Sequence, residues 1–208
     1  MSVNFEGFGK IARLNRECVV TEKIDGTNAQ ILILLRAETK DWDQYPPQFL
    51  LAGNSDMVML AGSRTKFLSI STKNGDNYGF GRWVYENNEE LFKLGPGRHF
   101  GEWWGKGIQR GYGLEEKRFS LFNTARWGKA EDRPACVGVV PVLYQGPFTT
   151  EDVNGCVKNL KTYGSMAVPG YMNPEGVVVY HTAANELFKV TCEGDEKWKG
   201  PERKEENG

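Results

Sequence analysis

The stretch EKIDGTN, Glu22–Asn28, lies between two apolar runs, Cys18–Val20 and Ile31–Leu35. Both runs favour strands, and the Asp-Gly step between them is typical of the tight turn of a β-hairpin. The sequence therefore predicts two strands that meet at a turn carrying Lys23. Taken alone, the pattern also fits a hairpin with an exposed lysine, because Asp-Gly turns and surface lysines are both common.

Further short motifs follow this stretch at wide intervals. Each places a charged, hydroxyl or aromatic side chain in or beside a predicted strand. In chain order they are Ser63–Arg64, Phe100–Trp103, Phe119–Phe122, Glu175–Val179 and Phe188–Val190. No single motif is specific, but their order and spacing together span most of the chain.

With these motifs behind it, Lys23-x-Asp25-Gly26 followed by Asn28 resembles the nucleophile motif of the covalent nucleotidyltransferase superfamily, which comprises RNA ligases, DNA ligases and mRNA capping enzymes. The resemblance implies an α+β adenylation domain with mostly antiparallel sheets around a nucleotide cleft and flanking helices. It also implies that Lys23 attacks the α-phosphate of ATP and becomes joined to AMP. Because an ammonium has no lone pair, Lys23 must lose a proton before it attacks.

The resemblance assigns roles to residues of the other motifs as well. Lys189 would hold the α-phosphate, Arg64 the ribose or the incoming phosphate, and Glu102 the ribose hydroxyls. Phe122 would stack on adenine, for which an aromatic face in a strand is suited.

The same resemblance assigns Asp25 and Glu175 to a hydrated Mg²⁺ or Mn²⁺. Such a hard cation takes carboxylates and keeps several of its waters. Asn28 would approach the phosphates, and Glu22, Ile24 and Glu175 complete the predicted nucleotide-binding set.

Several of these residues also have a purely structural interpretation. Glu102 and Glu175 lie in apolar segments, where a buried carboxylate needs a partner, so a salt bridge is the alternative. Phe122 is also suited to a core, Arg64 to a solvated surface, and Lys189 to the water-facing side of a strand.

Length and composition restrict the class of protein. At 208 residues the chain is long enough for one well-buried domain, which we expect over residues 1–192, followed by a charged tail over 193–208. The net charge of −1 gives no global basic field, so a nucleic acid would have to be held by a local groove. The sequence shows no signal peptide and no membrane-spanning run, so we expect a soluble, intracellular protein of the cytoplasm, or of the host cytoplasm if a phage encodes it.

Cysteine and histidine usage is sparse. The four cysteines are scattered without a Cys-x-x-Cys pair, so we expect reduced thiols rather than a zinc site. The two histidines, His99 and His181, stand at predicted strand ends and are expected to be structural. This usage argues against His-Glu-x-x-His metalloproteases and paired-histidine phosphoesterases.

Hydrophobic periodicity predicts a helix over Asn77–Lys93 and a second helix from Thr149 or Thr150 to about Tyr163. Shorter apolar or alternating segments predict strands. They are Phe49–Ala52, Met57–Ala61, Arg98–Trp104, Arg118–Asn123, Ala135–Tyr144, and a hairpin of Glu175–His181 with Leu187–Cys192.

Two further segments carry expectations. Phe5 and Phe8 are expected to anchor the N-terminal segment on the core. The glycine-rich stretch Gly105–Gly113 lacks the third glycine and the crossover pattern of a dinucleotide-binding loop, so we interpret it as a flexible loop near the site.

The last motif departs from the superfamily pattern. Nucleotidyltransferases commonly carry two lysines separated by one residue there, whereas Lys189 has Leu187 before it and Thr191 after it at that spacing. The short stretch after Lys189 cannot form the β-barrel domain of DNA ligases and capping enzymes. These features favour a stripped adenylation domain that resembles small, phage-type RNA ligases of RNA repair.

The sequence therefore predicts an ATP-dependent RNA ligase that joins 3′-hydroxyl and 5′-phosphate ends through lysine-AMP and an adenylated RNA 5′ end. The expected cofactors are ATP and Mg²⁺ or Mn²⁺, and RNA is the expected partner of a monomer. The sequence leaves open whether a separate protein heals the RNA ends or delivers the RNA. Basic residues around the Glu102 strand either line a path for RNA or form a mixed-charge surface. They are Arg98, Lys106, Arg110, Lys117 and Arg118.

Two alternatives remain. One is a small ligase that acts on a nick in DNA or in a hybrid duplex. The other is a nucleotide-binding protein of the same fold that does not ligate, which Thr191 favours and the intact motif around Lys23 disfavours.

Overall fold

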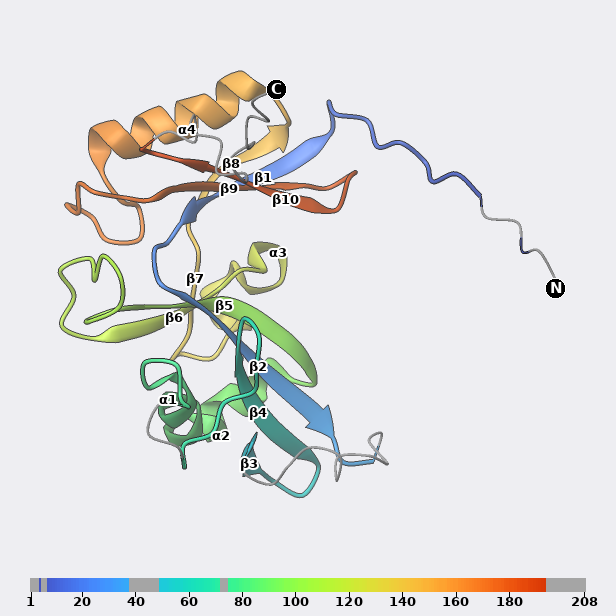
Figure 1. Ribbon diagram of the computed structural model, residues 1–208, viewed down its shortest axis with the longest axis vertical. Helices are drawn as coiled ribbons and strands as arrows, with labels where there is room; N and C mark the ends of the chain where they lie inside the picture. The colour runs from blue at the N-terminus through green and yellow to red at the C-terminus, as the bar shows by residue number, and fades with distance from the viewer. Residues whose placement is uncertain (1–3, 5–6, 38–48, 72–74, 194–208) are drawn as a thin grey trace, which may run out of the picture. The chain divides into compact units, whose positions relative to one another are not determined.

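The computed structural model describes residues 4, 7–37, 49–71 and 75–193. Phe5 and the tail from residue 194 onward, both subjects of sequence predictions, lie outside these ranges. The chain divides into two compact units (Figure 1). We call them the β1 unit (residues 1–23, 142–164 and 172–208) and the β2 unit (residues 24–141 and 165–171).

The two strands that flank the Asp-Gly step belong to different sheets. β1 (Glu17–Lys23) lies between β8 (Val142–Pro147) and β9 (Gly176–His181) in a four-stranded sheet. β2 (Thr27–Leu35) lies between β4 (Met57–Ser63) and β5 (Gly97–Gly105) in a six-stranded sheet. The predicted hairpin is therefore wrong, and the step carries the chain from one sheet to the other. Gly26 is needed for a close approach rather than for a turn, because a Cβ there would lie 2.5 Å from the Trp103 carbonyl oxygen.

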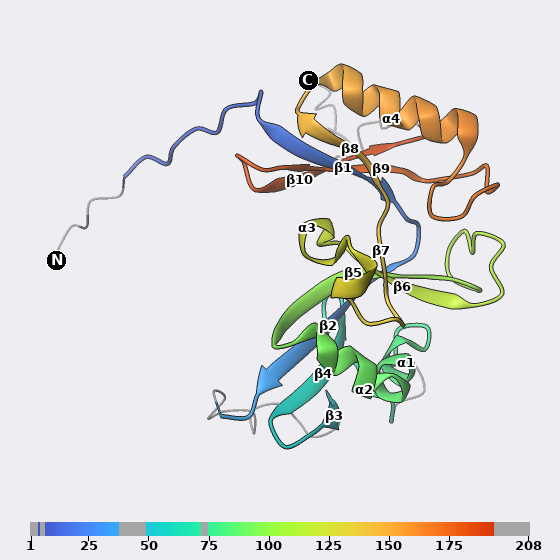
Figure 2. The ribbon, with the colours of Figure 1, turned by 180° about the vertical axis from the view of Figure 1, so that it is seen from behind.

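The β1 unit is an antiparallel sheet with the strand order β10-β9-β1-β8, with α4 along one face (Figures 1 and 2). Its further elements are β8 (Val142–Pro147), α4 (Thr150–Tyr163), β9 (Gly176–His181) and β10 (Glu186–Thr191). The predicted helix and the predicted β9–β10 hairpin are confirmed.

The start of α4 and its buried side follow from the sequence pattern. Thr149 is the N-cap, and its side chain accepts a hydrogen bond from the Asp152 N–H. The apolar residues of α4 recur at helical spacing and pack on alternate residues of β1 and β9. This core consists of Val153, Cys156, Val157 and Leu160 with Cys18, Val20, Val177 and Val179.

The β2 unit is a sheet with the order β3-β4-β2-β5-β6-β7, antiparallel except for the β6–β7 pair. Its further strands are β3 (Leu50–Gly53), β4 (Met57–Ser63), β5 (Gly97–Gly105), β6 (Lys117–Leu121) and β7 (Gly138–Val139). Its helices are α1 (Phe80–Glu86), α2 (Asn88–Leu91), η3 (Phe92–Leu94), α3 (Thr124–Trp127) and η4 (Ala130–Asp132).

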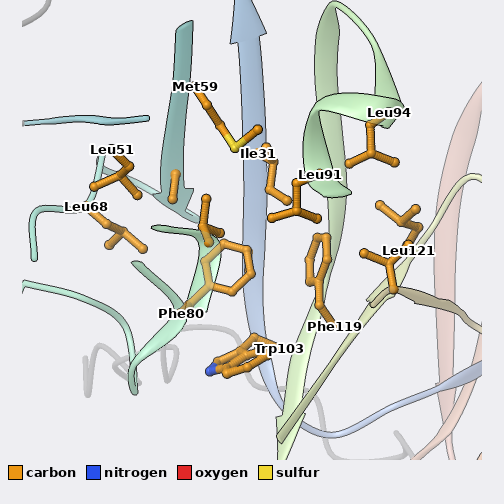
Figure 3. Packing of buried hydrophobic residues seen from close by; sticks show 14 of the residues in the cluster. Ile31, Leu51, Met59, Leu68, Phe80, Leu91, Leu94, Trp103, Phe119 and Leu121 are labelled. Atoms are coloured by element: carbon orange, nitrogen blue, oxygen red, sulfur yellow. The ribbon is translucent and has the colours of Figure 1, made fainter. Parts of the chain in front are cut away.

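One face of the six-stranded sheet carries the larger core. Ile31, Met59, Trp103 and Phe119 come from four neighbouring strands and meet Phe80 of α1 there (Figure 3). Because side chains alternate along a strand, the even-numbered residues of β2 and β5 lie on the opposite face.

Two predicted elements are broken in the structure. The helix expected over Asn77–Lys93 starts only at Phe80 and is interrupted at Asn87, whose side-chain amide donates to the Trp83 carbonyl oxygen at 2.8 Å. The strand expected over Ala135–Tyr144 is divided between β7 and β8 with Pro141 between them, where no N–H is available for a ladder.

Smaller expectations have mixed outcomes. Phe8 is 92% exposed, so its expected anchoring on the core is wrong. His99 and His181 are both buried in strands, as expected. All four cysteines are free thiols.

The predicted α+β class with mostly antiparallel sheets is confirmed. Within the described ranges, no helix has the length and apolar character that a bilayer crossing requires.

Candidate active site

Lys23 ends β1, and register places it in a row with one residue of each of the last two motif strands. Lys23 pairs with Gly176 of β9, which pairs with Thr191 of β10, and the next row on the same face carries Lys189. We call this surface, opposite α4, the lysine face. A side chain is excluded at Gly176, where φ is 153° and a Cβ would lie 2.2 Å from the Val190 carbonyl oxygen.

Glu175 holds the Lys23 ammonium. The Lys23 Nζ lies 2.5 Å from Glu175 Oε1, and both side chains are largely buried, with exposed fractions of 26% and 19%. The structural alternative for Glu175, a salt bridge, is thus realised, but its partner is the predicted nucleophile. A charge-assisted hydrogen bond of this length fixes the direction of a flexible lysine side chain.

The other oxygen of this carboxylate bears on metal binding. Glu175 Oε2 is buried and has no hydrogen-bond partner among the described residues. A buried carboxylate oxygen needs a donor or a cation. Glu175 Oε2 is therefore suited to accept a hydrogen bond from a water molecule of a hydrated divalent ion. Among the described residues, including those around Glu175, no group of three or more His, Cys, Asp or Glu residues is placed to hold a metal.

Asn28 organises the predicted nucleotide-binding residues of the β2 unit. It lies directly opposite Glu102 in the β2–β5 ladder, and its Nδ2 donates to Glu102 Oε2 at 3.0 Å. The Arg64 Nε donates to Asn28 Oδ1 at 2.8 Å. The amide therefore bonds a guanidinium on one side and a carboxylate on the other, which fixes its orientation. Glu102 is nearly buried, whereas Arg64 is exposed.

Phe122 follows β6 directly and is not a core residue. Its N–H donates to the Phe100 carbonyl oxygen at 3.0 Å, which continues the β5–β6 ladder, and its side chain is 41% exposed. Alternation along these strands puts Phe122 on the same face as Asn28 and Glu102. We call this the Glu102 face.

Asp25 is held by two residues of the glycine-rich loop. Its carboxylate Oδ2 accepts a hydrogen bond from the Arg110 Nε at 2.9 Å, and its N–H donates to the Tyr112 hydroxyl at 2.9 Å. Tyr112 is buried between Trp104 and Tyr171, with ring centroids 5.0 and 4.5 Å away. The loop that we expected to be flexible therefore anchors the residue two positions after Lys23.

Two predicted nucleotide-binding residues have buried side chains. Glu22 is 1% exposed and points to the α4 side of β1, and Ile24 packs with Trp104, Tyr112 and Val140. Any contact of Ile24 with a nucleotide would therefore come from its main chain. Lys189, by contrast, is exposed.

Three residues make contacts with Asp25, Thr27 or Asn28 that the sequence did not predict. They are Arg110 and Tyr112, and Asn77, whose side chain accepts from the Thr27 hydroxyl at 3.1 Å and donates to the Asn28 carbonyl oxygen at 3.3 Å. Asn77 and Tyr78 both have positive φ, at 52° and 57°, which is uncommon outside glycine. The glycines around Arg110 indicated a loop, but no local signal indicated what that loop contacts.

All five basic residues proposed to line an RNA path have partners within the described chain, and three of these partners are carboxylates. Lys106 pairs with Glu115, Arg110 with Asp25, and Arg118 with Glu116. Lys117 donates to the Tyr78 carbonyl oxygen, and Arg98 to the Gln30 side chain. The mixed-charge interpretation therefore describes most of this set.

Comparison with known proteins gives a family and a fold. The model of the RNA ligase family matches residues 16–191. No curated protein matches the sequence. Three structures of Naegleria gruberi RNA ligase mutants are similar to this chain, one with ATP and Mn, one with AMP and Mn, and one without ligand. Their identities are 17%, 18% and 19%, and each has a TM-score of 0.53.

The coverage of these structures is unequal. The alignments span 86% of this chain but only 50%, 51% and 50% of those three chains. This chain therefore spans about half the length of the ligases that it resembles, and at this identity the likeness establishes the shared fold.

Proposed function

Because the chain belongs to the RNA ligase family, we propose that it is an ATP-dependent RNA ligase that joins 3′-hydroxyl and 5′-phosphate ends through a Lys23–AMP intermediate. The observation that carries the proposal is the Lys23–Glu175 pair, in which the nucleophile is held 2.5 Å from a largely buried carboxylate. The ATP and AMP complexes of the similar Naegleria gruberi ligase support ATP as the AMP donor.

In the first step, Lys23 transfers its ammonium proton and its nitrogen attacks the α-phosphorus of ATP. The bond from this phosphorus to the α,β-bridging oxygen breaks, and pyrophosphate leaves. Glu175 Oε1 is the acceptor in place for the proton. A bound Mg²⁺ or Mn²⁺, held through water by Glu175 and Asp25, would neutralise charge on the phosphates.

The nucleotide would be held by residues with complementary chemistry. Glu102, oriented by Asn28, accepts from ribose hydroxyls, and Phe122 stacks on adenine. Arg64 and Lys189 supply cations for the phosphates, where a phosphoryl-transfer transition state spreads its charge.

The two remaining steps use the RNA ends. A 5′-phosphate oxygen attacks the phosphorus of Lys23–AMP, the nitrogen–phosphorus bond breaks, and Lys23 regains a proton. A 3′-hydroxyl then attacks the 5′-phosphorus of the adenylated end, AMP leaves, and a phosphodiester forms.

A nucleotide-binding protein that does not ligate is the second candidate. The observation that favours it is Thr191, which stands in the cross-strand row of Lys23 in place of a second phosphate-binding lysine. Such a protein would bind ATP without forming a phosphoramidate.

The test is a ligation assay with the purified chain, ATP and Mg²⁺. Singly nicked duplexes and single-stranded substrates in RNA, DNA and hybrid form compare the possible partners. Joined RNA that depends on Lys23, and that survives in Lys93→Ala, supports the proposal. Lys93 is a matched control because its Nζ also lies 2.5 Å from a carboxylate, that of Glu90, on an exposed helix. Joining of DNA alone, or no joining of any substrate, contradicts it.

A further inference from the structure

Two large aromatic side chains stand side by side on the Glu102 face. Phe100 is 52% exposed, Phe122 is 41% exposed, and the backbone hydrogen bond between them makes them direct cross-strand neighbours. Directly opposed side chains in an antiparallel ladder have Cβ atoms roughly 4.5–5.5 Å apart. The function proposed above uses only Phe122.

The surroundings of Phe100 are polar and cationic. On its other side it pairs with Gln30 of β2, and the Gln30 Oε1 accepts from the Arg98 Nη1 at 2.5 Å. Arg98 is exposed and lies two residues before Phe100 on the same face. Among the described residues of β2, β5 and β6 on this face, Glu102 is the only carboxylate.

This combination differs from the apolar contact surface of a protein partner. An exposed ring on a sheet, next to a guanidinium held in place by a neutral amide, matches a nucleotide, which offers a flat base and an anionic phosphate. Phe100 lies opposite Phe122 and two residues before Glu102 on the same face of the sheet. The exposed ring and the guanidinium are therefore next to the residues proposed to bind ATP.

We propose that Phe100 and Arg98 form a subsite for one nucleotide of the RNA substrate, with the base stacked on Phe100 and its phosphate on Arg98. This inference rests on the proposed function, because it assigns the subsite to the nucleic acid being joined. Gln30 acts as a positioning residue that fixes the guanidinium.

RNA binding tests the subsite without ligation. We would measure the Kd of a 5′-phosphorylated single-stranded RNA by fluorescence anisotropy for the full chain and for Phe100→Ala. Loss of one stacked base raises Kd by about 5- to 150-fold. Phe100→Tyr, which keeps the ring, should bind like the parent chain. Tyr85→Ala is the matched control, because Tyr85 is 51% exposed on α1 in the same unit.

A second readout separates this subsite from the ATP site. Formation of Lys23–AMP from ATP alone should stay within about twofold of the parent rate in Phe100→Ala, and Arg98→Gln should reduce the salt dependence of RNA binding by about one charge. Unchanged Kd in Phe100→Ala, or equal losses in Phe100→Ala and Tyr85→Ala, would overturn the subsite. A loss of Lys23–AMP formation in Phe100→Ala would also overturn it, by placing Phe100 in the ATP site. Absence of Lys23–AMP in the parent chain contradicts the proposed function, and RNA binding would still decide the subsite.

Discussion

At the scale of single residues, five of the ten predicted site residues are joined to one another by hydrogen bonds or an ion pair. Asn28 joins Arg64 to Glu102, and Glu175 holds Lys23. Asp25 has different partners, Arg110 and Tyr112, which come from the glycine-rich loop. These two residues do not supply the proposed chemistry themselves, but they fix the main chain at Asp25, two residues after Lys23.

Tyr112→Phe tests this anchoring role. The substitution keeps the buried ring and removes only the hydroxyl that accepts from the Asp25 N–H. We expect a loss of about 1–3 kcal/mol in the free energy of unfolding, because a partly buried donor loses its acceptor. We also expect Lys23–AMP formation to slow by about 10- to 100-fold through misplacement of the nucleophile.

Urea unfolding and single-turnover labelling with ATP measure the two effects of Tyr112→Phe. Tyr144→Phe is the control, since the Tyr144 hydroxyl donates to the Pro147 carbonyl oxygen at an exposed position of the β1 unit. Equal labelling rates in the two variants would show that Tyr112 has no positioning role.

At the scale of elements, local patterns predicted individual strands better than their pairing. The period of apolar residues and the Thr149 cap were sufficient for α4, and alternation was sufficient for β5 and β9. The Asp-Gly step was misread because a turn signal does not say which strands pair. In the structure, Ile24 packs with Trp104 and Gly26 lies close to Trp103 and Trp104, and these tryptophans lie far away in sequence.

Two glycine-to-alanine substitutions should change the free energy of unfolding in opposite directions. Gly26→Ala places a Cβ 2.5 Å from the Trp103 carbonyl oxygen and 2.7 Å from Trp104 Cβ, so we expect destabilisation of about 1–3 kcal/mol or more. Gly155→Ala lies inside α4 with no atom within 4 Å of the added carbon, so we expect stabilisation of up to about 1 kcal/mol.

Chemical denaturation of the two glycine variants, followed by circular dichroism, compares these effects. A Gly26→Ala protein as stable as the parent chain would mean that the crossing between the sheets is not tightly packed.

At the scale of the whole molecule, the candidate site residues divide between the two units. Lys23, Glu175 and Lys189 belong to the β1 unit, and the Asn28 group belongs to the β2 unit. The order of motifs along the chain predicted these residues but not their division between two units. The chain passes from one unit to the other several times, so no linker in the sequence marks a boundary. The expectation of one domain over residues 1–192 stays a prediction.

The stability of the β2 unit should depend on pH through His99. Burial lowers the pKa of His99 below its ordinary value of 6.5, the hydrogen bond to the Gly95 carbonyl oxygen opposes this, and Arg126 adds to it. The unfolded chain therefore takes up the proton first as the pH falls. The stabilisation is present above about pH 6.5 and is lost below it, by at most about 1.4 kcal/mol per pH unit.

His99→Gln should remove this component. Its free energy of unfolding should change less between pH 7.5 and pH 5.5 than that of the parent chain. Tryptophan fluorescence follows the transition, since the His99 ring packs edge-on against Trp127 at 5.8 Å. An identical pH dependence in both proteins would contradict the assignment to His99.

The proposed function requires that Lys23 becomes covalently joined to AMP. The most direct measurement is peptide mass spectrometry of the denatured chain after incubation with ATP and Mg²⁺, starting from protein freed of bound AMP, with Lys23→Ala and Lys93→Ala alongside. We expect one AMP adduct, on the peptide that contains Lys23, present in Lys93→Ala and absent from Lys23→Ala. An unmodified Lys23 peptide with ATP, and also with GTP, would rule out the covalent mechanism and favour a protein that binds nucleotides without forming the intermediate.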